Sequence, residues 1–567
     1  MNNLPIIVGY GGINAAGRSI FDFAHKRMVY DSLSRSDQKE TIKSLAALTG
    51  NNDVKFNLEN SLIRKIDNNF FKKNSLRDPA MSAHAGGQLP SPFDPSTTYN
   101  ARQHPRALAM TILAVSDAIK SIGIEWDEIT KKVSLEKISC ISGCAVAQAD
   151  KFGMGGMFQA SLSGSRITSK HLAMSLGEMS ADFAHSYVLG SMGVTGNHTG
   201  ACATFQYNLR LGIDLIASGH SKICLVGAAE SGLVPEVYEA FAATKGLAED
   251  NNLIELQKSL GEAYKEVNYR KACRPFGENV GMSLGEAAQF IVLMSHDLAL
   301  ELGCNIHGAA LSSHIHADGY KKSISGPGAG NYLTVGKIFN DISNSFGHQA
   351  LQKTIFHAHG TGTPQNRITE SHVISNLAKT FKIKQMPLVA IKSYLGHSLA
   401  AAGGDQIISM MGSWNTGLLP GIKTIPAIAD NVYKDNIDFC LEDRLIDDIS
   451  IDFAILNAKG FGGNNGTALV MSPNKTFDTL SSMSAKKSLK EYLKNNEEVQ
   501  KRLLKERKEV VNKPPIARYI FGKNVIDGEE DIKFDNKSLY VSKINKHISI
   551  ESQLPYKKIF KKNDKKE

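Results

Sequence analysis

The sequence predicts an α/β layered protein built from two similar halves, with a charged extension at its C-terminus. Three observations lead to this fold class. Short apolar runs of strand length alternate with stretches whose apolar residues recur at helical spacing. A strand, a tight turn and a helix follow one another in both halves of the chain. Most of the net charge of +9 lies after residue 475.

The first half contains the clearest helical pattern. Between residues 107 and 122, Leu108, Ile112, Val115 and Ile119 recur at helical spacing. A second helix is predicted over residues 200–217. Apolar runs predict buried strands over residues 4–8, 138–146, 223–228 and 289–294. Residues 82–98, rich in Gly, Pro and Ser, predict a long loop, and the polar residues 249–270 predict an exposed insertion.

The second half repeats this alternation. Strands are predicted over residues 353–357, 388–391, 452–458 and 467–471. One helix is predicted over residues 366–381. A second helix is predicted after the strand at 388–391, and it runs through residue 410. Strand–turn–helix units in both halves are compatible with a duplicated domain.

The basic surplus belongs to the extension alone. From Thr476 onward there are 22 Lys and Arg against 14 Asp and Glu, whereas the preceding 475 residues hold 43 against 42. A basic surface favours an acidic partner, which can be nucleic acid, anionic lipid or an acidic carrier protein. The mixture of both signs without interleaved aromatic residues favours a charge-laced helix over residues 484–511 rather than nucleic-acid binding.

The composition excludes several classes of protein. Seven cysteines in 567 residues are too few for a disulfide framework, and 17 Pro with 49 Gly exclude a collagen-like or low-complexity chain. The opening MNNLPIIVGYGG lacks a basic segment followed by a long apolar one. No run approaches the ~18 apolar residues of a membrane span. We therefore expect a soluble protein of a reducing cytoplasm.

A candidate nucleophile is Cys202, in the small-residue segment TGACAT (residues 199–204) at the start of a predicted helix. The helix dipole and nearby backbone N–H groups favour the thiolate there and so lower the pKa of the thiol. Taken alone, the segment fits a buried structural cysteine better, because such cysteines are common. Cys140 and Cys144 have no second pair, so a zinc site is not expected.

Two histidine segments follow predicted strands, where the ligand sites of α/β sheets lie. The first is HAHGTGTP (residues 357–364), in which His357 and His359 share a face if the strand continues. His357 has no second signal and is interpreted as a satisfied structural histidine. The second segment, KSYLGHSLAAAGG (residues 392–404), carries Lys392 and His397.

A glycine-rich loop, GFGGNNG (residues 460–466), can bring backbone N–H groups close to a ligand and supply one donor of an oxyanion hole. The alternative is a plain β-hairpin loop, because Asn465-Gly466 is a common hairpin signal.

The order and context of these four segments resemble the β-ketoacyl-ACP synthases, condensing enzymes of the thiolase fold, over residues 100–472. Two histidines with a lysine resemble the decarboxylating class rather than the Cys-His-Asn class. Residues 6–18, residues 89–95 and the C-terminal tail resemble a longer bacterial variant that joins acetyl-CoA to malonyl-ACP.

The resemblance implies a five-layered αβαβα thiolase fold. It implies an N-terminal half (1–302) with the nucleophilic cysteine, a C-terminal half (303–475) with both histidines and the lysine, and a basic extension (476–567). It also implies a homodimer with residues 153–193 near the interface, acyl carrier protein as a partner, and neither a metal nor another cofactor.

The resemblance also implies roles for individual residues. Cys202 takes the acyl primer, and His359 and His397 hydrogen-bond the thioester carbonyl of malonyl-ACP. The backbone N–H groups of Cys202 and Phe461 form the oxyanion hole, and Phe461 is the gating aromatic residue. Lys392 orders the site. Its charge is balanced by Glu370, and the remaining supporting residues are Thr361, Thr363, Gly460 and Gly462.

Three positions depart from the family pattern: Arg367 and Gln406 stand where acids are common, and Lys459 stands where an aromatic residue is common. These departures leave open how Lys392 is neutralised and how the acyl pocket is shaped. The alternatives are an elongating synthase that uses acyl-ACP, a polyketide-type synthase, a non-catalytic partner subunit and a nucleic-acid-binding protein.

Overall fold

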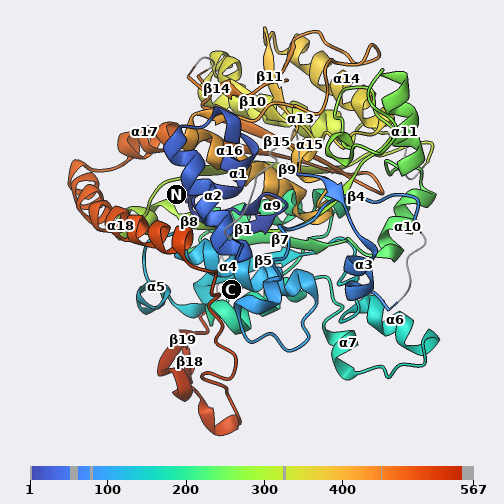
Figure 1. Ribbon diagram of the computed structural model, residues 1–567. Coiled ribbons are helices and arrows are strands. Elements are labelled where there is room, and N and C mark those ends of the chain that lie inside the picture. Colours follow the sequence, from blue (N-terminus) through green and yellow to red (C-terminus); the bar gives the residue numbers. More distant parts are fainter. Residues whose placement is uncertain (1–2, 52–61, 77–80, 324–326, 448–449, 552–567) are drawn as a thin grey trace, which may run out of the picture.

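The computed structural model describes residues 3–51, 62–76, 81–323, 327–447 and 450–551. Its core is a continuous mixed sheet made of two sub-sheets with the same strand pattern (Figure 1). In the first sub-sheet, two antiparallel pairings are followed by two parallel ones, in the order β1 (Pro5–Asn14), β8 (Leu284–Ser295), β7 (Ile223–Ser231), β5 (Ile138–Gly143) and β6 (Thr195–Gly196).

The second sub-sheet repeats this order of pairings and adds one more strand. It runs through β9 (Gly308–Ala317), β16 (Asn464–Met471), β15 (Phe453–Gly460), β10 (Thr354–His357), β11 (Met386–Val389) and β13 (Ile437–Phe439). A short pairing of β1 with β9 joins the sub-sheets. The repeated pattern is the duplication that the alternating sequence predicts.

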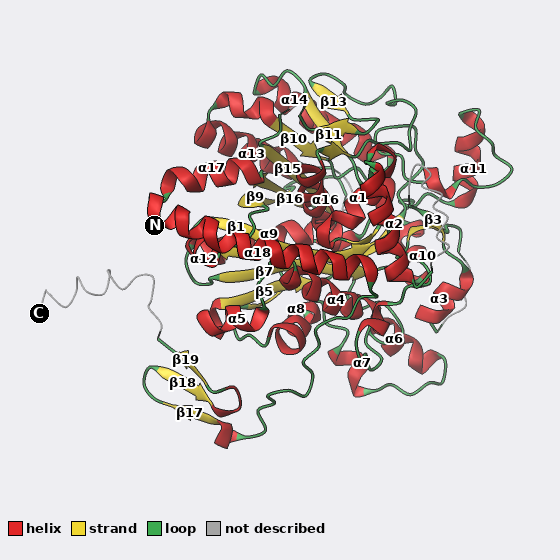
Figure 2. Cartoon of the chain, turned by 60° about the vertical axis from the view of Figure 1, so that its left-hand side comes forward, coloured by secondary structure: helices red, strands yellow, loops and turns green. Residues whose placement is uncertain are grey.

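Helices form three layers around the two sub-sheets, as Figure 2 shows. α9 (Thr204–Ala217) packs on β7 and β9, and α16 (Ala402–Thr416) packs on β8 and β15, so this pair lies between the sub-sheets. The outer layers are α4 (Arg106–Lys120) with α8 (Met179–Ala184), and α13 (Gly330–Phe346) with α14 (Pro364–Thr380). The architecture is therefore αβαβα, and the predicted thiolase fold is confirmed.

The central strands are buried on both faces. Their sequences are therefore continuous apolar runs, without the alternation of apolar and polar residues seen in half-exposed strands. Their bounds differ from the predicted ones by a few residues. The largest difference is at β1, predicted to end at Val8. It extends to Asn14 because Gly9, Gly11 and Gly12 let α4 and Gln289 approach closely; an added Cβ on any of them would lie within 3.0 Å of those groups.

The remaining helices cover the edges of the core. They are α1 (Phe23–Met28), α2 (Arg35–Thr49), α3 (Asn68–Asn74), α5 (Trp126–Lys132), α6 (Met154–Leu162), α7 (Ser169–Ala173), α10 (Pro235–Ala243), α11 (Asp250–Ser259), α12 (His296–Leu302) and α15 (Lys392–Leu395). Short strands are β2 (Gly17–Arg18), β3 (Arg64–Lys65), β4 (Ala85–Gly87), β12 (Leu418–Leu419) and β14 (Arg444–Leu445). The predicted insertion at residues 249–270 contains α11.

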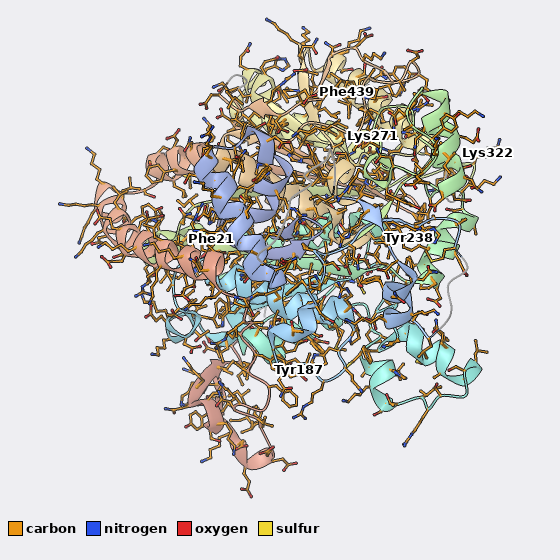
Figure 3. The ribbon with its side chains drawn as sticks, in the orientation of Figure 1. Phe21, Tyr187, Tyr238, Lys271, Lys322 and Phe439 are labelled. Atoms are coloured by element: carbon orange, nitrogen blue, oxygen red, sulfur yellow. The ribbon has the colours of Figure 1, made fainter. Side chains whose placement is uncertain are left out.

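The extension begins with α17 (Pro473–Met483) and the long helix α18 (Lys486–Asn512), which packs on α2 and α12. Arg507 forms a bidentate ion pair, with two hydrogen bonds, with Glu40 of α2. Val510 and Val511 pack with Ile20 and Phe23, and Figure 3 shows the neighbouring Phe21 beside α18. The highly charged helix predicted over residues 484–511 is therefore α18, and it packs against the rest of the protein.

After α18 the chain crosses the N-terminal half. Tyr519 stacks among Tyr99 and Tyr187, and Tyr187 is labelled at the lower edge of the body in Figure 3. A small antiparallel sheet of β17 (Ile532–Phe534), β18 (Ser538–Val541) and β19 (Lys546–Ser549) then stands apart from the core (Figure 2). Within the described ranges, no helix is long and apolar enough to span a membrane.

Candidate active site

The structure brings the sequence-predicted site residues from both halves to one cavity of about 360 Å³. Cys202, His359, His397 and Phe461 all line it. Cys202 lies just before α9, His359 lies two residues after β10, His397 lies two residues after α15, and Phe461 lies in the turn between β15 and β16. These are the loops after the carboxyl ends of neighbouring strands, where the ligand sites of α/β sheets form.

The segment before Cys202 holds the thiol in a sharp turn. Ala201 has φ of +49°, an uncommon conformation for a residue with a side chain. Cys202 lies in a 3₁₀ turn (Ala201–Ala203) that leads into α9, which starts at Thr204 rather than at residue 200 as predicted. This turn directs the sulfur at the cavity beside the first turn of the helix.

The pKa of Cys202 differs from the sequence expectation. Burial raises it to about 12, because the thiolate loses its hydration. The Lys392 charge and the backbone N–H groups of Phe461 and Cys202 lower the pKa, but by less than burial raises it. The prediction of a depressed pKa was wrong because it counted the helix start and not the desolvation. Burial therefore favours the neutral thiol of Cys202 at pH 7, and the backbone N–H groups of Phe461 and Cys202 favour the thiolate more weakly.

The loop of residues 460–463 approaches the nucleophile so closely that it requires glycine. A Cβ on Gly460 would lie 2.2 Å from the carbonyl oxygen of Gly200 and 3.1 Å from the backbone nitrogen of Cys202. Gly462 has φ of +85°. The loop is also the β-hairpin turn between β15 and β16, as the hairpin interpretation predicts, although Asn465 and Gly466 lie within β16.

Phe461 projects from this loop into the mouth of the cavity. Its ring is 44% exposed and stacks on Phe241 of α10 at a centroid distance of 5.6 Å. Phe241 also lines the cavity, and no motif in the sequence marks it.

The two histidines face each other, with ring centroids 5.4 Å apart and planes at 90°. Burial, followed by the charge of Lys392, lowers the pKa of both rings well below 6.5, so both are neutral at pH 7. Nδ1 of His359 accepts the backbone N–H of Lys459 at 3.3 Å, which leaves the proton on Nε2. Neither ring nitrogen of His397 has a partner within the described part of the chain. Two neutral imidazoles can therefore donate to one oxygen in the cavity.

His357 does not join this pair. β10 ends at His357, so the backbone does not keep the alternation that would put both side chains on one face. The buried ring of His357 lies against Met410 of α16, with Nε2 3.3 Å from Sδ. Its Nδ1 has no partner among the described residues, so the predicted satisfied histidine is structural but not fully hydrogen-bonded.

Lys392 and Glu370 position His359 through hydrogen bonds to its backbone. The Lys392 ammonium donates to the carbonyl oxygen of His359 and lies 3.4 Å from its Nδ1. Glu370 accepts the backbone N–H groups of His359 at 2.7 Å and Gly360 at 2.9 Å, and also binds the side-chain amides of Asn366 and Asn457. Burial lowers the pKa of Lys392, and Glu370 opposes this through space rather than through a direct ion pair.

Both threonines of the glycine-rich turn line the cavity, and Thr363 also caps a helix. Thr361 lines the cavity and its hydroxyl lies 3.2 Å from that of Thr363. Thr363 caps α14 by accepting the backbone N–H of Asn366 at 3.3 Å.

The three departures from the family pattern have partners in the structure. Arg367 pairs with Glu278 and donates to the carbonyl oxygen of Gly277. Gln406 donates to the backbone oxygens of Ala358 and Asn457 and so ties strand ends together. Lys459 lines the cavity, and its ammonium donates to Thr369 at 3.2 Å.

A buried thiol that shares one cavity with two neutral imidazoles, on a duplicated αβαβα fold, defines the class of condensing acyltransferases. The chain belongs to the β-ketoacyl synthase family. The family model described as "Beta-ketoacyl synthase, N-terminal domain" matches residues 57–299, and the one described as "Beta-ketoacyl synthase, C-terminal domain" matches residues 307–425.

Known relatives agree with this assignment. Beta-ketoacyl-[acyl-carrier-protein] synthase FabY of Pseudomonas aeruginosa is 37% identical over 83% of this chain and 86% of its own length. The crystal structure of that noncanonical ketosynthase matches with a TM-score of 0.91 and covers 99% of both chains. A 3-oxoacyl-[acyl-carrier-protein] synthase 2 of Staphylococcus aureus is 24% identical over 76% of this chain and 97% of its own length. The predicted resemblance to a long bacterial variant is confirmed.

Proposed function

We propose that this β-ketoacyl synthase condenses an acetyl primer, taken from acetyl-CoA onto Cys202, with malonyl-ACP, and that it thereby starts fatty acid synthesis. One observation carries the proposal: the thiol of Cys202, the two neutral imidazoles and the N–H groups of Cys202 and Phe461 converge on one cavity. An elongating role with acyl-ACP as primer is the second candidate, because the same residues serve it.

In the first step Cys202 attacks the thioester carbonyl of the primer. The C–S bond to coenzyme A breaks, a C–S bond to Cys202 forms, and the thiol proton leaves with the coenzyme A thiol. The negative charge on the carbonyl oxygen is stabilised by the two backbone N–H groups. Removing one such donor typically costs ~3–4 kcal/mol of transition-state stabilisation.

In the second step malonyl-ACP enters, and Nε2–H of His359 and a ring N–H of His397 bind its thioester carbonyl oxygen. The carbon–carbon bond to the carboxylate breaks, and the carboxylate leaves as carbon dioxide. The electron pair forms an enolate whose charge rests on the oxygen held by both imidazoles. The enolate carbon attacks the acetyl group, the Cys202 C–S bond breaks, and the thiolate regains a proton.

Charge at the cavity mouth supports an acidic acyl carrier protein as the partner. Lys245, Lys321 and Lys459 line the cavity against one acid among the described residues, Asp318, which pairs with Lys321 at 3.4 Å. Charge complementarity of this kind raises the association rate. A related ketosynthase structure, AntDE:AntF, has a TM-score of 0.59 and is described as an acyl-carrier protein in complex with its ketosynthase.

An apolar face on α6 and α7 supports a homodimer. Phe158, Leu162 and Leu172 are 63%, 89% and 64% exposed, and they lie in the segment 153–193 that the sequence assigns to an interface. Clusters of this kind mark protein interfaces. The proposed division remains 1–302, 303–475 and 476–567.

The nucleophile is tested by Cys202→Ala, with Cys304→Ala as the matched control. Both changes remove one buried sulfur, and Cys304 packs on Met294 outside the cavity. Formation of acetoacetyl-ACP from acetyl-CoA and malonyl-ACP is expected to disappear in the first variant and to persist in the second. Retained condensation by Cys202→Ala would refute the proposed nucleophile.

A further inference from the structure

A second cavity, of about 410 Å³, adjoins the active-site cavity and has no role in the chemistry described above. It lies between the N-terminal end of α13, one face of α14 and the segment at Tyr433; α13 and α14 lie side by side in Figure 1. Pro327, Thr369 and Lys459 line both cavities. The two cavities therefore adjoin along these three residues, so that one ligand can contact both.

The walls of this second cavity suit a flat aromatic ring. Tyr332 and His372 are joined by a hydrogen bond, and the His372 and Tyr433 rings meet edge to face at a centroid distance of 4.7 Å. Tyr433 is 46% exposed, so part of this residue is accessible to a ligand. Ile368 and Val373 of α14 add apolar surface. The volume is in the range of small-molecule sites, ~300–1,000 Å³.

Positive charge lies where the two cavities meet. The ammonium of Lys459, which lines both cavities, donates to Thr369, and Lys321 lines the first cavity, where it pairs with Asp318 at 3.4 Å. The first cavity thus holds the reactive thiol, Lys459 lines both cavities, and the aromatic rings line the second. Coenzyme A thioesters present the matching order: an acyl thioester, then phosphates, then adenine.

We propose that the second cavity binds the adenine end of the coenzyme A primer, with Tyr433 against the base and Lys459 near the phosphates. The inference rests on the proposed use of acetyl-CoA. A substrate carried by an acyl carrier protein has no base for this cavity, so the cavity distinguishes the two kinds of donor. Tyr433 is then a specificity-determining residue of the priming step.

The test measures acetylation of Cys202 from acetyl-CoA and from acetyl-pantetheine, which has the same thioester but no nucleotide. Loss of a base–aromatic stack weakens binding about 5- to 150-fold. Tyr433→Ala is therefore expected to raise KM for acetyl-CoA by that factor and to leave KM for acetyl-pantetheine unchanged. Tyr433→Phe keeps the ring and is expected to keep the wild-type KM. Tyr264→Ala, an exposed tyrosine outside both cavities, is the matched control.

An equal change in KM for both donors, or no change for either, would overturn the inference. Binding of adenosine 3′,5′-bisphosphate, measured by calorimetry on the full chain, separates this failure from failure of the proposed function. If neither donor acetylates Cys202, the primer assignment falls. Weaker binding of the bisphosphate to Tyr433→Ala than to wild type then still supports the cavity, and equal binding rejects it.

Discussion

His397→Ala separates the two chemical steps of the proposed reaction. The His397 ring lines the cavity, and neither of its ring nitrogens has a partner among the described residues. The substitution therefore removes a donor for the substrate without breaking a side-chain hydrogen bond within the protein. Loss of one donor of a pair costs ~3–4 kcal/mol of transition-state stabilisation, which is a factor of about 10²–10³ in rate.

That loss is expected in decarboxylation and not in priming. Release of carbon dioxide from malonyl-ACP by acetylated enzyme should fall by the full factor. Acetylation of Cys202 should stay within about threefold of wild type, because the backbone N–H groups of Cys202 and Phe461 serve that step. Both rates can be measured on one preparation, by radiolabelled carbon dioxide and by mass spectrometry. An equal loss in both steps would refute the division of roles.

Three further predictions follow from the same geometry. Gly460→Ala places a Cβ 2.2 Å from a backbone carbonyl oxygen, so condensation should fall at least about tenfold in initial-rate assays, whereas Gly528→Ala, in open space, should leave it unchanged. The raised pKa of Cys202, about 12, predicts that its alkylation by iodoacetamide accelerates about tenfold per pH unit beyond pH 9; a plateau near pH 9 would contradict it. Arg507→Met should destabilise the fold by about 1 kcal/mol in thermal unfolding, with turnover unchanged, because the partly exposed pair with Glu40 only fastens α18 to α2.

The sequence was sufficient for the elements whose burial follows from a local pattern. The helix predicted over residues 107–122 is α4 (Arg106–Lys120), and the apolar run at 223–228 lies in β7 (Ile223–Ser231). Both are buried throughout or nearly so, so apolar spacing and packing point to the same answer. The small sheet of β17–β19 was not predicted, because its strands are short and partly exposed and lack a continuous apolar run.

The site was predictable as a set of residues but not as an electrostatic environment. Cys202, His359 and His397 carry sequence motifs, and the structure brings them to one cavity. The direction of the Cys202 pKa shift depends on how completely the surrounding halves exclude water, which no local segment encodes. Phe241 and Tyr433 lie in segments without a motif, and only tertiary packing brings them to the cavities.

The most direct test of the account is the identity of the group that Cys202 accepts. Purified protein is incubated separately with acetyl-CoA and with a longer acyl-ACP, and the adduct is located by intact and peptide mass spectrometry. The account predicts an acetyl group on Cys202 from acetyl-CoA. Acylation of Cys202 only from acyl-ACP would contradict the priming role and assign the enzyme to chain elongation. No adduct on Cys202 from either donor would contradict the proposed nucleophile itself.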